Sequence, residues 1–111
     1  MTMQWKLMCE QQDLIEGAGI AAMLDGQQIA LFYVPEAEQK VFAISNWDPI
    51  GKANVLSRGL LANLKEQWTV ASPLYKQHYE LQSGQCLEEE GVKVTTWPVK
   101  LETGKVFVAC R

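Results

Sequence analysis

The chain has 111 residues, of which 48% are hydrophobic and 21% charged, and its formal net charge is −3. A chain of this size and composition is expected to form one domain over residues 1–111 with a hydrophobic core of its own, and it lacks the bias of a disordered segment or a fibrous repeat. Its ten basic residues are scattered, which argues against a nucleic-acid partner, because binding to a phosphate backbone needs a clustered basic surface.

Targeting signals and stabilising crosslinks are not indicated. No apolar run approaches the roughly 20 residues that a membrane-spanning helix needs, and residues 1–13 do not have the pattern of a signal peptide. We therefore expect a cytoplasmic protein with no membrane partner. Cys9, Cys86 and Cys110 are an odd number at wide spacings, which indicates neither a disulfide framework nor a zinc site, and we expect them to be reduced packing residues.

The first third of the chain consists of short β-prone runs separated by turn residues. Residues 5–8 are expected to form the first strand. Residues 19–24 and 27–33 should form a hairpin around Asp25-Gly26, because aspartate and glycine accept the positive φ angles of a tight type I′ turn.

The next run predicts a strand and then a loop. Residues 40–45 should form a strand, and we expect its Phe42 and Ile44 side to face the core, because successive side chains of a strand alternate between its two faces. Residues 46–54 contain Asp-Pro and a glycine, which interrupt regular structure and predict an extended first loop.

A second loop and a terminal hairpin complete the pattern. Residues 67–71 and 77–81 are expected to be strands on either side of a proline-containing loop over residues 72–76. Residues 92–99 and 105–109 should pair through a Glu-Thr-Gly turn. Both loops therefore follow predicted strands.

Helix is scarce in this sequence. A turn or two of helix is plausible at residues 11–15 or 60–65, but both segments are too short for helix propensity alone to stabilise them. The expected fold class is all-β, a sandwich or barrel of antiparallel strands.

Three phrases, FAISNWDP, VLSRGLL and WTVASPLYKQHYELQSGQC, follow one another in this order. Their order resembles that of Rieske-type domains and, within them, the small subunits of NAD(P)H-dependent nitrite reductase. In a Rieske domain the first loop carries Cys-X-His and the second carries Cys-X-X-His. A phrase such as Pro-X-His-Gly-X-X-Phe-Asp-Leu-X-X-Gly-X-Cys runs on directly from the cysteine of the second loop and includes the histidine of that loop. The resemblance implies a Rieske-like sandwich with two loops at the end where a cluster would lie.

The cluster ligands of the family have no counterpart in this chain. Position by position, the first loop's cysteine and histidine fall on Asp48 and Ile50, and those of the second loop fall on Ser72 and Tyr75. A Rieske cluster requires two thiolates and two imidazoles, and the whole chain has one histidine, His78. The resemblance therefore implies a domain with no 2Fe-2S cluster, no metal and no other cofactor of its own.

The resemblance also implies a partner, the large subunit of nitrite reductase. That subunit is expected to hold FAD, a 4Fe-4S cluster and sirohaem and to reduce nitrite to ammonium with electrons from NADH or NADPH. This chain would then be a non-catalytic supporting subunit with no catalytic residue. A cofactor-free regulatory or small-molecule-binding β-domain unrelated to nitrite remains the alternative.

Three residues are candidates for the partner interface. Trp47 lies in the first loop, where a tryptophan is costly to expose without a partner. Arg58 could bind a partner carboxylate with its planar guanidinium, or could simply belong to a Ser-Arg-Gly turn. Tyr75 lies in the second loop.

The two loops themselves allow two interpretations. Asp48, Ile50, Ser72 and Tyr75 could form a docking tip that survives without the cluster, or they could be ordinary loop residues held by packing. A related hypothesis is that Ile50, Leu74 and Tyr75 form a small hydrophobic plug in place of the cluster.

Overall fold

The computed structural model describes residues 3–110, which form an antiparallel β-sandwich and confirm the all-β prediction. Within these residues no helix is long and apolar enough to cross a membrane. In chain order the elements are β1 (Gln4–Glu10), the 3-10 helix η1 (Gln11–Asp13), β2 (Gly19–Leu24), β3 (Gln27–Tyr33), β4 (Val41–Ser45), β5 (Trp47–Asp48), β6 (Ala53–Asn54), the 3-10 helix η2 (Leu56–Arg58), β7 (Leu60–Leu64), β8 (Gln67–Ala71), β9 (His78–Glu80), β10 (Thr96–Trp97), β11 (Val99–Glu102) and β12 (Lys105–Cys110).

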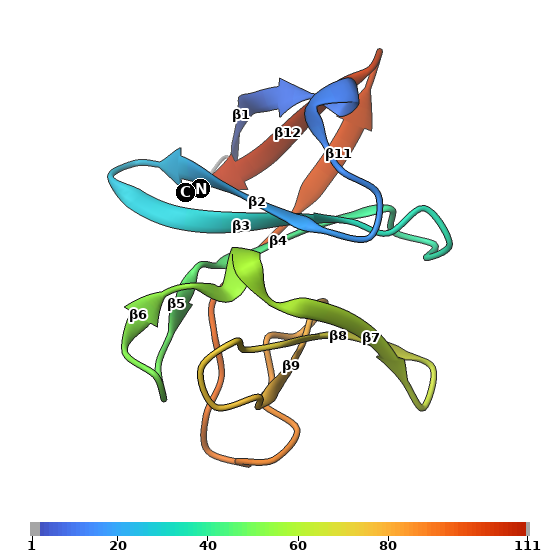
Figure 1. The fold of residues 1–111 in the computed structure, drawn as a ribbon. Helices are drawn as coiled ribbons and strands as arrows, with labels where there is room; N and C mark the ends of the chain where they lie inside the picture. Colours follow the sequence, from blue (N-terminus) through green and yellow to red (C-terminus); the bar gives the residue numbers. More distant parts are fainter. Residues whose placement is uncertain (1–2, 111) are drawn as a thin grey trace.

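The strands are arranged in layers. A terminal sheet has the order β1-β12-β11, and a central sheet has the order β10-β4-β3-β2. A third sheet has the order β7-β8-β9, and β5 pairs with β6. Figure 1 shows the terminal sheet above the central sheet, with strands β5 to β9 and the loops after β8 and β9 below it. The β5–β6 turn and the loop after β8 thus lie in the same half of the molecule.

Strand β3 separates two hydrophobic cores, because successive side chains of a strand point to opposite faces. Ala30 and Phe32 belong to the first core, which lies on the side of β7 to β9. Ile29 and Leu31 belong to the second core, on the side of the terminal sheet. All four side chains are fully buried.

Strand β4 is buried on both faces, although the sequence predicts burial of only its Phe42 and Ile44 side. Phe42 and Ile44 join the first core as predicted, but Val41 and Ala43 on the opposite face are only 1% exposed and join the second core. The terminal sheet covers that opposite face. From the sequence one core is expected, and a second buried face on β4 is therefore not predicted.

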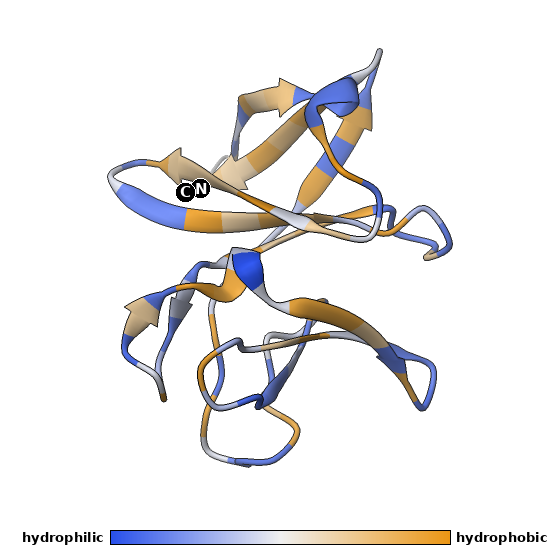
Figure 2. Cartoon of the chain, viewed as in Figure 1, coloured by the Kyte–Doolittle hydropathy of each residue, from blue (hydrophilic) through white to orange (hydrophobic). Residues whose placement is uncertain are grey.

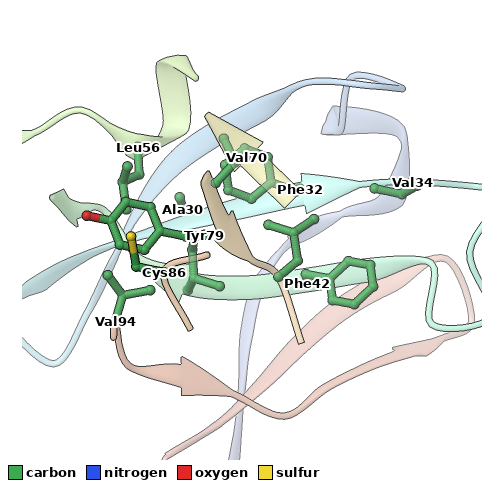
Figure 3. Close-up of a cluster of buried hydrophobic side chains, with 11 residues drawn as sticks. Ala30, Phe32, Val34, Phe42, Leu56, Val70, Tyr79, Cys86 and Val94 are labelled. Carbon is green, nitrogen blue, oxygen red and sulfur yellow. The ribbon is translucent and has the colours of Figure 1, made fainter. Parts of the chain in front are cut away.

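The first core supports the loops discussed below. Figure 3 shows side chains from β3, β4, β8 and β9 meeting in this core, together with Leu56 of η2 and with Cys86 and Val94. Each large apolar side chain that is fully buried there stabilises the fold by about 1.5 to 3 kcal/mol. The cysteines pack as predicted: Cys86 lies in the first core, Cys110 lies in the second, and Cys9 packs against the second.

Two hairpins agree with the prediction. β2 and β3 are joined by Asp25 and Gly26 with φ angles of 48° and 84°, as a type I′ turn requires. β11 and β12 are joined through Thr103 and Gly104, both with positive φ. The first strand of this terminal hairpin starts at Val99 rather than at residue 92.

Two segments differ from the prediction. Residues 60–64 form strand β7 instead of a helix, because they pair with β8 over its full length while Leu61 packs against the first core. The predicted loop at residues 46–54 contains the short strands β5 and β6, which pair through Trp47 with Asn54 and through Asp48 with Ala53. At residues 11–15 the helix is limited to the single turn of η1.

Candidate functional site

The two loops that resemble cluster loops are joined directly by Asp48 and Ser72. Asp48 ends β5 and Ser72 follows β8, and their side chains are 0% and 1% exposed. The Ser72 hydroxyl donates a hydrogen bond to Asp48 Oδ2 at 2.5 Å. The two positions on which the resemblance places the cysteine ligands therefore face each other, and a buried hydrogen bond connects them.

A third residue, Tyr79, anchors this pair to the first core. The Tyr79 ring is fully buried, and Figure 3 shows it beside Cys86 and Val94 with its hydroxyl oxygen pointing away from the other labelled side chains. That hydroxyl donates a hydrogen bond to Asp48 Oδ1 at 2.8 Å, and the backbone N–H of Ile50 donates to the same oxygen at 3.0 Å. Asp48, Ser72 and Tyr79 form what we call the tie.

The tie favours an ionised Asp48. Burial by itself raises the pKa of the Asp48 carboxyl, but hydrogen bonds donated by Ser72, by Tyr79 and by backbone amides of the first loop outweigh burial. The pKa of Asp48 consequently lies below its usual range. Burial and the neighbouring carboxylate raise the pKa of Tyr79 well above its usual range, so its hydroxyl keeps the proton that it donates.

We predict a specific pH dependence of stability from Asp48. Because its pKa is lowered in the folded state, Asp48 contributes stability that is fully present above about pH 5 and is lost as the pH falls through the folded-state pKa. Urea unfolding of the wild type and Asp48→Asn should therefore give a difference in the free energy of unfolding that shrinks on acidification.

The Asp48→Asn comparison isolates this one carboxyl. The hydrogen bond from Lys6 also lowers the pKa of Asp25, but both proteins contain that pair, so its contribution cancels. A difference that stays constant from about pH 6 to about pH 3 would contradict a lowered pKa at Asp48.

The other two aligned positions lie in different surroundings. Ile50 is half-buried and packs against the first core. Leu74 packs closely over Gly51, since a β-carbon at Gly51 would lie 2.5 Å from its Cδ1. Tyr75 is 67% exposed, so the hypothesis of a three-residue plug is wrong for this residue. The tie and the contact of Leu74 with Gly51, rather than a three-residue plug, join the two loops.

The three interface candidates are all exposed, but the structure does not gather them into one place. Trp47 is 45% exposed on β5. Arg58 ends η2 and lines a groove of about 300 Å³ beside the second loop, together with Lys76 and His78. Trp47 does not line this groove. Arg58 is therefore grouped with the second loop, while Trp47 belongs to the first.

Sequence reasoning missed several contributors to the site. Tyr79 was expected only as part of a strand, although the alternation of β9 between buried and half-buried side chains is consistent with its inward position. His78 has an acidic partner ten residues away: its Nδ1 lies 2.8 Å from Glu88 Oε2, and its backbone N–H donates to Glu88 Oε1 at 2.7 Å. Nothing in the local sequence marks Glu88 as that partner.

The side chains at the four positions that correspond to cluster ligands by resemblance do not suit a Rieske cluster. They are a carboxylate, an alkyl group, an alcohol and a phenol, whereas the cluster requires two thiolates and two imidazoles. The carboxylate already accepts hydrogen bonds from both loops and from β9. Over residues 3–110, no group of three or more histidine, cysteine, aspartate or glutamate side chains is placed to hold a metal ion.

A larger hollow lies away from both loops. It has a volume of about 670 Å³ and is lined by η1, Glu10, Glu16 and the Thr103-Gly104 turn, among others. Figure 1 shows η1 and this turn at the opposite end of the molecule from the β5–β6 turn. None of the predicted site residues lines it.

Comparisons with known proteins identify the family of this chain. Residues 4–109 match the family model of the Rieske-like 2Fe-2S domain. The chain is 42% identical over 103 residues to the nitrite reductase (NADH) small subunit of Salmonella typhimurium, which covers 93% of this chain and 94% of that relative. A solved small subunit of nitrite reductase from Erwinia carotovora matches with a TM-score of 0.79 at 38% identity, covering 96% of this chain and 82% of that one.

One further relative is much longer than this chain. The nitrite reductase NAD(P)H large subunit of Klebsiella oxytoca contains a segment that is 42% identical over 104 residues, covering 94% of this chain but 11% of that protein. The family match spans nearly all of the described residues, and the small-subunit relatives are matched over almost their full length. The chain therefore belongs to the Rieske-like domain family and, within it, to the small subunits of NADH-dependent nitrite reductase.

Proposed function

We propose that this chain is a non-catalytic subunit that binds and supports a large nitrite reductase subunit in the cytoplasm and carries no cluster of its own. The observation that carries the proposal is the Klebsiella oxytoca large subunit, in which a segment like this chain is part of the same polypeptide. Two domains that are joined in one protein and separate in others commonly associate. The replacement of all four aligned ligands supports a role without electron transfer.

In this proposal the chemistry belongs to the large subunit. FAD, a 4Fe-4S cluster and sirohaem on that subunit would pass electrons from NADH or NADPH to nitrite and yield ammonium, which serves nitrite assimilation or detoxification. The protein chain around such cofactors supplies binding, orientation and shielding, and a supporting subunit can contribute to each of these.

The proposed interface is the end of the molecule that carries the two loops. Trp47 and Tyr75 are 45% and 67% exposed there, and large aromatic side chains are the ones that most often dominate binding when a partner covers them. The tie holds both loops in place, because Ser72 lies three residues before Tyr75 and Asp48 lies directly after Trp47. The partner would thus meet a surface that is already ordered.

The decisive experiment is a titration of this protein into its cognate large subunit, purified from cells that lack this chain. NADH-dependent nitrite reduction should rise and saturate as the protein is added, and the added protein should contain no iron and no acid-labile sulfide. Saturation by an iron-free protein separates structural support from electron transfer.

Variants in the same titration map the interface. Trp47→Ala and Tyr75→Ala should shift the midpoint to higher concentration, whereas Leu7→Ala, which truncates a 55% exposed residue of β1, should not. Absence of any restoration, together with no co-elution of the two proteins, would contradict the proposal. Stabilisation by a small metabolite in place of partner binding would then favour the regulatory or ligand-binding alternative.

A further inference from the structure

The groove beside the second loop combines apolar and cationic side chains. It has a volume of about 300 Å³, and its lining includes Arg58, Leu60, Pro73, Lys76 and His78. Leu60 is 75% exposed, and Figure 2 shows strand β7, which it begins, as largely apolar. No acidic residue lines the groove.

The cations of the groove are available to a partner. Both Arg58 and Lys76 are exposed, and neither forms an ion pair or a side-chain hydrogen bond with another residue in the range 3–110. His78 differs, because Glu88 holds its Nδ1 at 2.8 Å. The chain as a whole has a net charge of −3, so two unpaired cations beside an apolar strand form a local exception.

Lys76 is held in an unusual backbone conformation. Its φ angle is 64°, in the left-handed region that residues other than glycine seldom adopt. The backbone N–H of Lys76 donates to Ser72 O at 3.0 Å, and the backbone N–H of Ser72 donates to Gln77 O at 2.8 Å. Ser72 is in turn bonded to Asp48. These bonds fix the backbone at Lys76, and Lys76 lines the same groove as Arg58.

We infer that this groove binds an acidic segment of the large subunit, with a carboxylate between Arg58 and Lys76 and an adjacent apolar side chain against Leu60 and Pro73. The inference rests on the proposed function, since it names the chemistry of the partner surface. The planar guanidinium of Arg58 suits a carboxylate, because it can donate two parallel hydrogen bonds. The apolar strand start excludes water from that ion pair and thereby strengthens it.

The test is a binding measurement between this protein and its cognate large subunit, with charge-reversed variants. Arg58→Glu and Lys76→Glu should each raise the Kd about tenfold or more, and the double variant should raise it further. The wild-type Kd should also rise with salt concentration, since salt screens the attraction between the exposed charges of the two separate proteins. Thermal unfolding of each variant should match the wild type, because both side chains are exposed and unpaired.

Lys65→Glu is the matched control. Lys65 is also an exposed lysine in the left-handed conformation, with a φ angle of 51°, but it lies in the β7–β8 turn and does not line the groove. Its reversal should change the Kd less than about twofold. If a reversed variant does not fold, Arg58→Gln and Lys76→Gln remove each charge without reversing it. Both should still raise the Kd.

The outcomes separate this inference from the proposed function. Tight wild-type binding that the double variant retains would overturn the groove inference and leave the supporting-subunit role intact. A wild-type protein that does not bind the large subunit would overturn both. A third outcome would assign the groove to a small anion and overturn the inference. In that case sodium nitrite would perturb the Lys76 amide resonance in the isolated wild type but not in Arg58→Glu, and neither charge-reversed variant would change binding to the large subunit.

Discussion

Asp48→Ala should lower the free energy of unfolding by about 3 to 5 kcal/mol, which is a large share of the total for a domain of this size. The substitution leaves the buried hydroxyls of Ser72 and Tyr79 without their acceptor and frees the Ile50 amide. Each buried polar group without a partner costs about 1 to 3 kcal/mol. Urea unfolding should show a lower midpoint with an unchanged slope.

Smaller changes in the tie should rank below this one. Tyr79→Phe keeps the buried ring and removes one donor, so the expected loss is about 1 to 2 kcal/mol. Ser72→Ala should fall in the same range. The effects of the two variants should not add, because both donors share one carboxylate. An Asp48→Ala protein within about 1 kcal/mol of the wild type would contradict a stabilising role for the tie.

Gly84→Ala should cost at least about 3 kcal/mol and is the second large effect that we expect. Gly84 has a φ angle of 81°, and a β-carbon there would lie 2.0 Å from the backbone oxygen of Val94. The neighbouring chain cannot easily withdraw, because the backbone N–H of Val94 donates to Gly84 O at 2.9 Å. Backbone strain and a steric clash therefore act together.

Gly26→Ala separates the two contributions. Gly26 has a similar φ angle of 84°, but no atom lies within 4 Å of the β-carbon position. Its replacement should cost only the backbone strain of about 1 to 2 kcal/mol. Thermal or urea unfolding of both variants measures the difference. Equal losses at Gly26 and Gly84 would show that the close approach of Val94 has no energetic consequence.

Turn chemistry explains which hairpins could be predicted from the sequence. The β2–β3 hairpin has the Asp25-Gly26 pair, whose residue types favour positive φ. The β7–β8 hairpin has an equally tight turn, but Lys65 and Glu66 adopt φ angles of 51° and 66° there. Neither residue type signals such a turn, and each pays about 1 to 2 kcal/mol for the conformation. The pairing of β8 with both β7 and β9 compensates this cost. The residue types of the turn alone do not predict that pairing.

The candidate site could be predicted only in part. The family resemblance places the two cysteine positions on Asp48 and Ser72, but the hydrogen bond between these residues links positions 24 apart and depends on the whole fold. Three residues match the residue types of the Rieske phrase: Tyr79, Gly84 and Cys86. Each of them has a structural role in this chain. Tyr79 and Cys86 lie in the first core, and Gly84 fits closely against Val94.

Lys76 illustrates the opposite case. The Rieske phrase has glycine at this position, and the φ angle of 64° explains that preference. A lysine here adopts a less favourable backbone conformation than glycine would, and it adds a second cation to the groove that Arg58 lines. Sequence reasoning did not single it out, because a lone lysine in a loop is usually just solvated surface.

The tie is made of a carboxylate and two hydroxyl groups, so no metal–ligand bond is needed to join the two loops. Thiolate–iron bonds at the same place would depend on iron supply and could be damaged by oxygen. Loops joined by oxygen-based hydrogen bonds can be completed as soon as the chain leaves the ribosome, in aerobic or anaerobic cells alike. For the cluster-free subunit proposed above, folding would thereby be uncoupled from the cell's machinery for building iron–sulfur clusters.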